Sequence, residues 1–155
     1  MEVRSYKIEM TSESLDNLIA RVGYAYQNSY IRSFFFRQKY ETGAKEFLVI
    51  KFEQRMTKKQ TIATLQEMGL RPAYAEELVT FDLQPGDLTL GKKVLALGTR
   101  YQNRAEEFVM VDNRSHHSDF ISGRHRNNGP GHNLEIYGDD GCVLNADLWI
   151  AAVRI

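Results

Sequence analysis

The sequence lacks the features that place a chain outside the cytoplasm or in a membrane. Only one of its 155 residues, Cys142, is a cysteine, so an intrachain disulfide is excluded and a reducing compartment is the simplest location. No apolar run approaches the roughly 20 residues of a membrane-spanning helix. The charged opening Met1–Arg4 is unlike a signal peptide. We therefore expect a cytoplasmic protein with no membrane partner.

The sequence also has no excess of charge of either sign. Lys and Arg number 20, and Asp and Glu number 20, which argues against a generic polyanion binder but allows a local basic patch. With 43% hydrophobic and 26% charged residues, the chain has enough apolar side chains for one core. Its length fits a single globular unit, residues 1–155, in which we distinguish an N-terminal strand and helix part, residues 1–55, from residues 56–155.

The known fingerprints of catalysis are missing as well. The sequence contains no phosphate-binding P-loop, no dinucleotide-binding fingerprint and no Gly-x-Ser-x-Gly nucleophile elbow. Three pairs of adjacent acids would point apart on a helix or strand, so we expect them to serve surface solubility; they are Glu76–Glu77, Glu106–Glu107 and Asp139–Asp140. We predict no catalytic residue, no cofactor and no metal ligand, and we lean towards a protein that is not an enzyme.

Hydrophobic periodicity predicts strands and helices in a mixed order. Alternation over residues 3–10 is typical of a half-buried strand, and apolar spacing over 15–22 is typical of an amphipathic helix. Thr57 and Gln60 form a capping box that begins a helix, and Gly69 supplies the left-handed residue that ends it. Also predicted are a strand over 47–52, a break at 71–72, a short helix over 73–81, and strands over 94–97, 108–111, 134–137 and 148–155. Because no helix is predicted beyond residue 90, the fold class is α+β, with an antiparallel C-terminal sheet and a long loop.

The long loop, residues 113–133, contains all four histidines and very few apolar residues. Loops of about 20 residues in a compact domain are uncommon and are usually either functional or disordered. Arginine and histidine side chains make this one cationic below about pH 6.5. We predict a non-enzymatic binding protein that uses the loop to recognise a protein or a small anionic ligand. The predicted ligand-binding residues are Arg114, His116, His117, Arg124, His125, Arg126 and His132. Because imidazoles and carboxylates also bind zinc-class metals, a metal-dependent hydrolase that uses this histidine-rich loop is an alternative.

An aromatic and basic stretch, residues 24–40, is the second candidate surface. It contains seven aromatic residues, and between residues 20 and 60 nine Lys and Arg face three Glu. Three consecutive phenylalanines cannot all face solvent, so we predict packing in the core or a two-fold homodimer interface. The predicted interface residues are Tyr26, Tyr30, Phe34, Phe35 and Phe36. The alternative is nucleic-acid binding, with Arg32, Arg37 and Lys39 on phosphates and aromatic rings stacked on bases.

Framework residues from about Met56 onward resemble a family of small uncharacterised bacterial and phage proteins. The matching pieces are Gly69–Ala73 with Glu76–Leu78, then Leu95–Thr99, then Trp149–Arg154. The family's final strand is similar to the end of C-type-lectin-like domains. The resemblance implies a lectin-like C-terminal sheet and a phage or mobile-element origin, and it speaks to fold, not to ligand. The calcium-binding Glu-Pro-Asn and Trp-Asn-Asp signatures are absent, which argues against calcium-dependent sugar binding.

Overall fold

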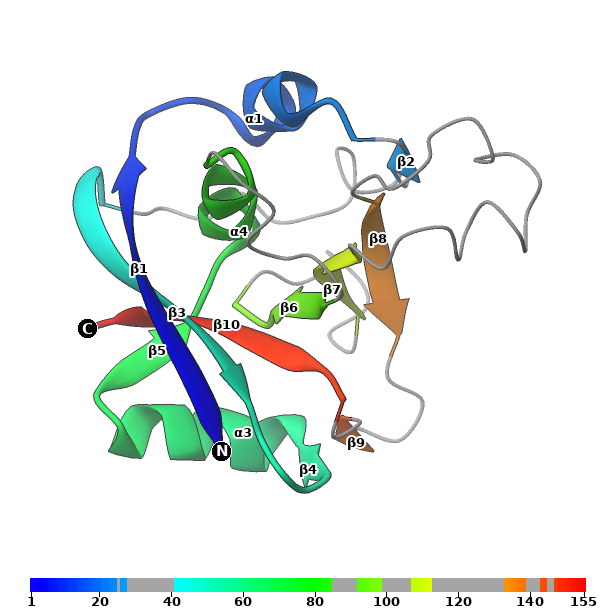
Figure 1. The fold of residues 1–155 in the computed structure, drawn as a ribbon. Helices are drawn as coiled ribbons and strands as arrows, with labels where there is room; N and C mark the ends of the chain where they lie inside the picture. Colours follow the sequence, from blue (N-terminus) through cyan, green and yellow to red (C-terminus); the bar gives the residue numbers. More distant parts are fainter. Residues whose placement is uncertain are drawn as a thin grey trace.

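A computed structural model describes residues 1–24, 26–27, 41–84, 92–98, 107–112, 133–138, 143–144 and 147–155 (Figure 1). In these residues the helices are α1 (Leu15–Val22), α3 (Lys58–Glu67) and α4 (Ala75–Asp82). The strands are β1 (Glu2–Met10), β2 (Tyr26–Gln27), β3 (Gly43–Lys51), β4 (Met56–Thr57), β5 (Leu70–Pro72), β6 (Lys93–Ala96), β7 (Glu107–Asp112), β8 (Asn133–Gly138), β9 (Val143–Leu144) and β10 (Trp149–Arg154).

One eight-stranded sheet organises the molecule. Its strands run in the order β1-β3-β10-β6-β7-β8-β2, and β5 also pairs with β10. β4 and β9 form a separate two-stranded sheet. Because β10 lies between β3 and β6, the last strand of the chain joins the N-terminal strands to the strands that carry the long loop. Residues 1–55 and 56–155 therefore share one sheet.

Helices cover both faces of this sheet. Cross-strand partners share a face, so alternate residues of β3 and β10 enter two different cores. On one face Val49 and Ala151 pack with α1 and α4, and Phe81 of α4 stacks on Phe47 with ring centroids 4.5 Å apart. On the other face Ile50 and its neighbours pack with Leu65 of α3. Figure 1 shows α1 and α4 on one side of the sheet and α3 on the other.

Local signals explain where α3 begins and ends. The Thr57 hydroxyl accepts from the backbone N–H of Gln60 at 3.0 Å, and the Gln60 side chain accepts from the N–H of Thr57 at 2.9 Å. Gly69 follows the helix with a φ of 74°, a left-handed conformation that glycine adopts without strain. The predicted capping box and the predicted glycine stop are both confirmed.

The α+β class is confirmed, and two details differ from the sequence prediction. β6 and β10 pair in parallel, with Trp149 beside Val94, although the other pairs around them are antiparallel. Residues 71–72, predicted as a break, belong to β5, which pairs with β10 with Pro72 opposite Ala152. A proline is tolerated here because, among the described residues, β5 pairs on one side only, with β10, and proline is accepted in strands with an unpaired side. Within the described residues, none of the helices has the length and apolar character needed to cross a membrane.

Gly98 has a packing role that its motif did not reveal. Its N–H donates to the backbone carbonyl of Ala73 at 2.9 Å. A Cβ atom added at Gly98 would lie 2.7 Å from that oxygen and 2.8 Å from Cδ1 of Tyr74. The chain after β6 therefore approaches the β5–α4 connection so closely that no larger residue fits.

Candidate functional site

The predicted recognition loop leaves and re-enters the sheet at one cross-strand pair. β7 ends at Asp112 and β8 begins at Asn133, and these residues are partners in the antiparallel ladder. The chain between them, residues 113–132, therefore starts and finishes on neighbouring strands about 5 Å apart. The predicted ligand-binding residues Arg114, His116, His117, Arg124, His125, Arg126 and His132 lie outside the described residues.

β2 brings the start of the aromatic stretch to the same place. Tyr26 pairs with Asn133, and Gln27 pairs with Leu134. Of the predicted interface residues, Tyr26 alone belongs to a described strand, and Tyr30, Phe34, Phe35 and Phe36 lie outside the described part, as do Arg32, Arg37 and Lys39. The fold thus places the backbone of Tyr26 beside the residue at which the recognition loop returns to the sheet. Two candidate surfaces that are far apart in the sequence begin next to each other.

A fully buried carboxylate lies in the first turn of α4. Glu77 accepts two parallel hydrogen bonds from the guanidinium of Arg71, at 2.8 and 2.7 Å, and a third from the backbone N–H of Tyr74 at 2.9 Å. The ammonium of Lys45 lies 3.8 Å from it. Burial alone would lower the pKa of Arg71, but the hydrogen bonds and charge of Glu77 outweigh this effect and raise it. The carboxylate is satisfied by these groups, so the cluster ties α4 to β5 and β3.

The expectation that Glu76 and Glu77 serve surface solubility is wrong, because both are buried, with exposed fractions of 6% and 0%. One sequence signal could have revealed Glu77. It occupies the third position of α4 and caps the helix start, which is where a capping-box acid stands. Tyr74, in place of the usual Ser or Thr at the cap, concealed the pattern.

Glu76 differs from Glu77 because its charge is poorly compensated. Its Oε2 atom has no hydrogen-bond partner among the described residues. Burial, with a contribution from the charge of Glu77, raises the pKa of Glu76 to about 7. At the other end of α4, burial raises the pKa of Tyr24 well above its usual value, and the negative charge of Asp82 adds to the effect. These groups titrate unusually, and none of them lines the pocket described below.

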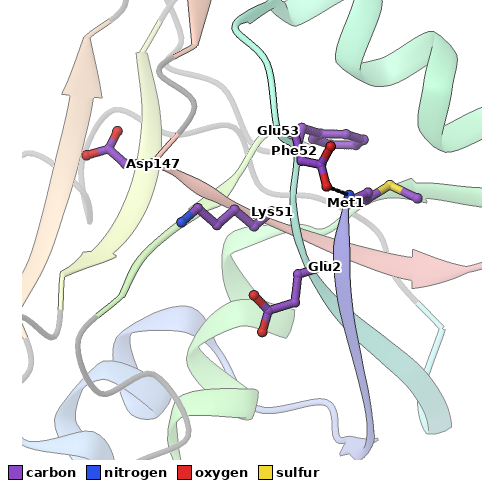
Figure 2. A pocket seen from close by; sticks show the side chains of 6 residues that line it. All are labelled: Met1, Glu2, Lys51, Phe52, Glu53 and Asp147. Carbon is purple, nitrogen blue, oxygen red and sulfur yellow. Dashed lines mark hydrogen bonds and ion pairs between the residues drawn. The ribbon is translucent and has the colours of Figure 1, made fainter.

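An open pocket of about 530 Å³ lies where β1 begins and β3 ends. Figure 2 shows the Lys51 side chain extending between the carboxylates of Glu2 and Asp147, while the amino group of Met1 forms an ion pair with Glu53. Phe52 completes the lining. The volume is in the range of small-molecule sites. Such sites are enclosed and mostly apolar, however, whereas this pocket is open and several of its lining residues are charged.

Two cations lie over the one tryptophan, close to this pocket. The guanidinium carbon of Arg4 is 5.4 Å from the ring centroid of Trp149, and the ammonium of Lys92 is 5.5 Å from it. Burial lowers the pKa of Lys92, and the charge of Arg4 lowers it further. Arg4 also forms an ion pair with Glu2 at 2.7 Å. The indole and Glu2 together hold these like charges at one end of the sheet.

The described residues contain no group of three His, Cys, Asp or Glu side chains that could hold a metal ion. All four histidines and Cys142 are outside this part of the chain, so the metal-hydrolase alternative stays a prediction. No protein-family model, curated protein or solved structure matches the chain. The resemblance to lectin-like proteins therefore also stays a prediction.

Proposed function

We propose that the protein is a non-enzymatic binding protein whose recognition surface is residues 113–133. The observation that supports this proposal best is the pairing of Asp112 with Asn133. This pair anchors both ends of residues 113–132 in the sheet, because β7 is hydrogen-bonded to β6 on one side and to β8 on the other. Binding residues are often carried on loops that a rigid scaffold positions.

The strand next to this pair supports a wider surface. Tyr26 pairs with Asn133, so the aromatic and basic stretch that follows β2 begins beside the loop. Tyrosine and arginine are enriched at the centres of protein interfaces. A partner that engages residues 113–133 can therefore also reach the backbone of Tyr26, where this stretch pairs with β8.

The proposed ligand is a protein or a small anionic molecule. Arg114, Arg124 and Arg126 belong to the loop, and the guanidinium fork matches carboxylate and phosphate geometry. Histidines titrate near pH 6.5, so the positive charge of the loop grows as the pH falls below that value. Binding of an anionic ligand should strengthen between about pH 7.5 and about pH 5.5.

The test compares the full chain with a variant that lacks residues 122–131, and with the variant Arg114→Gln, Arg124→Gln and Arg126→Gln. A matched control removes the same charge elsewhere, at the exposed residues Lys7, Arg55 and Lys59. Each immobilised protein is incubated with a cell lysate and, separately, with inorganic phosphate in a calorimeter. Captured proteins are identified by mass spectrometry, and thermal unfolding confirms that each variant is folded.

We expect the deletion to leave the thermal transition nearly unchanged and to abolish partner capture, whereas the control keeps it. The triple arginine variant should lose any phosphate binding. Partner capture that survives the deletion would show that the loop is not the site. Binding of single-stranded nucleic acid that weakens steeply with salt would favour the aromatic and basic stretch instead. Stoichiometric zinc in the purified protein would favour the hydrolase.

A further inference from the structure

We propose that β1 is a self-recognition edge, through which two copies of the chain join their sheets into one continuous sheet. This inference is independent of the proposed function. Among the described residues β1 pairs on one side only, with β3, and stands at one end of the sheet order. Figure 1 shows it along the outer side of the fold. An edge strand presents unpaired N–H and C=O groups, which are a template for another strand.

β1 lacks several devices that protect natural edge strands. Protected edges are short, contain proline or are interrupted by bulges. β1 is nine residues long, contains no proline, and keeps an unbroken register with β3 from Glu2 opposite Lys51 to Met10 opposite Gly43. No bulge therefore interrupts the outer backbone groups of β1, which a further strand could pair with.

The hydrogen bonds of β10 reveal which groups of β1 face outward. The carbonyl of Ala151 accepts from the N–H of Ala73 at 3.0 Å, on the side of β10 away from β3. Successive residues of a strand alternate in the direction of their backbone groups. The backbone N–H and C=O of Ile150 therefore point towards β3, where the partner residue is Ile50. The backbone groups of Ile50 point back towards β10, so by the same alternation those of Val49 point towards β1.

The outward groups of β1 follow from its register with β3. Arg4 is the partner of Val49, so the backbone N–H and C=O of Arg4 point towards β3. Those of Val3, Ser5 and Lys7 therefore point away from the sheet. A contact agrees with this assignment, because the side chain of Gln84 donates to the carbonyl of Lys7. That contact occupies the edge at Lys7. Among the described residues, the open part of the edge is therefore the segment that contains Val3 and Ser5.

Charge selects one register for two copies of this segment. A two-fold axis at Arg4 would place two arginines directly opposite each other, which is destabilising. An axis at Ser5 would require the carbonyl of Lys7, which Gln84 already occupies. An axis at Val3 pairs the outward groups of Val3 with their own copies. It also places Glu2 of each protomer opposite Arg4 of its partner, so opposite charges meet twice.

The side chains at this axis complement one another on both faces of the sheet. Arg4 already contacts Glu2 within one strand at 2.7 Å, so two copies would close a ring of four alternating charges. Charge networks stabilise more than isolated surface pairs. On the other face lies Val3, which with Met1 and Ile155 makes up the exposed large hydrophobic residues of the described chain, at 42% exposure for Val3. The interface is small, so we expect weak association, with a Kd between about 10 μM and about 1 mM.

Analytical ultracentrifugation of the full chain, from about 10 μM to about 1 mM, tests this proposal with charge variants. Arg4→Glu places Glu2 opposite a glutamate and should weaken association by at least about tenfold. Adding Glu2→Arg to Arg4→Glu restores the opposite-charge pairs and should restore association. Lys7→Glu is the matched control, because it makes the same change of charge on the same strand outside the register and should leave the Kd within about twofold. Thermal unfolding checks that each variant is folded.

Amide hydrogen exchange identifies the paired edge. Exchange at Val3 and Ser5 should slow as the wild-type concentration rises, and should not slow in Arg4→Glu. A wild-type protein that remains monomeric at about 1 mM overturns the proposal. So does a dimer that Arg4→Glu leaves intact and Phe35→Asp abolishes, which would identify the aromatic residues between Tyr26 and Phe36 as the interface. Protection of Val3 and Ser5 by an added extended peptide, without self-association, would mean that the edge serves a different partner.

Discussion

Substituting Glu76 with glutamine should remove a loss of stability that the protein undergoes as the pH rises towards neutrality. Glu76 is buried, and its Oε2 atom has no hydrogen-bond partner in the described residues. A buried carboxylate without a partner favours the protonated form. Its pKa is therefore raised from 4.5 to about 7.

The sign and size of the effect follow from this shift. Between pH 4.5 and about 7, the folded protein keeps a proton on Glu76 that the unfolded chain has released. The free energy of unfolding therefore falls as the pH rises through this window, and is flat above it as far as Glu76 is concerned. Each pKa unit corresponds to about 1.4 kcal/mol. The total contribution is on the order of 3 kcal/mol, and Glu76→Gln should recover most of it at pH 8.

Urea denaturation at half-unit steps from about pH 4 to about pH 8 measures this effect. Glu67→Gln, on the exposed side of α3, is the matched control and should follow the wild-type profile. The Glu76→Gln profile should lie close to wild type near pH 4.5 and above it by an increasing margin towards pH 8. Parallel profiles for wild type and Glu76→Gln over the whole range would refute the reasoning, since they would show that Glu76 is ionised and compensated in the folded state.

Two further predictions concern the packing around α4. Glu77→Ala should lower the free energy of unfolding by about 3 kcal/mol, because it leaves the partly buried guanidinium of Arg71 without its carboxylate; a loss below about 1 kcal/mol in urea denaturation, equal to that of Glu67→Ala, would contradict this. Gly98→Ala should cost about 1–3 kcal/mol, because its Cβ would meet the Ala73 carbonyl at 2.7 Å. Gly23→Ala is its control, with no atom within 4 Å of the added Cβ and a φ of 69°, and it should cost about 1–2 kcal/mol from backbone strain alone. A thermal transition of Gly98→Ala identical to that of wild type would contradict this prediction, because it would show that the β5–α4 connection shifts to make room for the added Cβ.

The elements that the sequence alone determines are those specified by neighbouring residues. The capping box of Thr57 and Gln60 and the stop at Gly69 involve groups at most a few positions apart, so α3 was readable without a structure. The alternation that predicted β1 is likewise local, although the structure buries only its last part, at Ile8 and Met10. The order of these elements was enough to predict the α+β class.

Only the tertiary structure decided which residues far apart in the sequence meet. The capping-box position marks Glu77 as a helix-start residue, but the burial of Glu76 and Glu77 depends on what packs over α4. The proposed sites have the same origin. The pairing of Asp112 with Asn133, the approach of Tyr26 to that pair, and the place of β1 at the end of the described sheet all depend on strand order. Strand order is set by long-range contacts whose free energy is shared across the whole sheet, and no short sequence pattern encodes it.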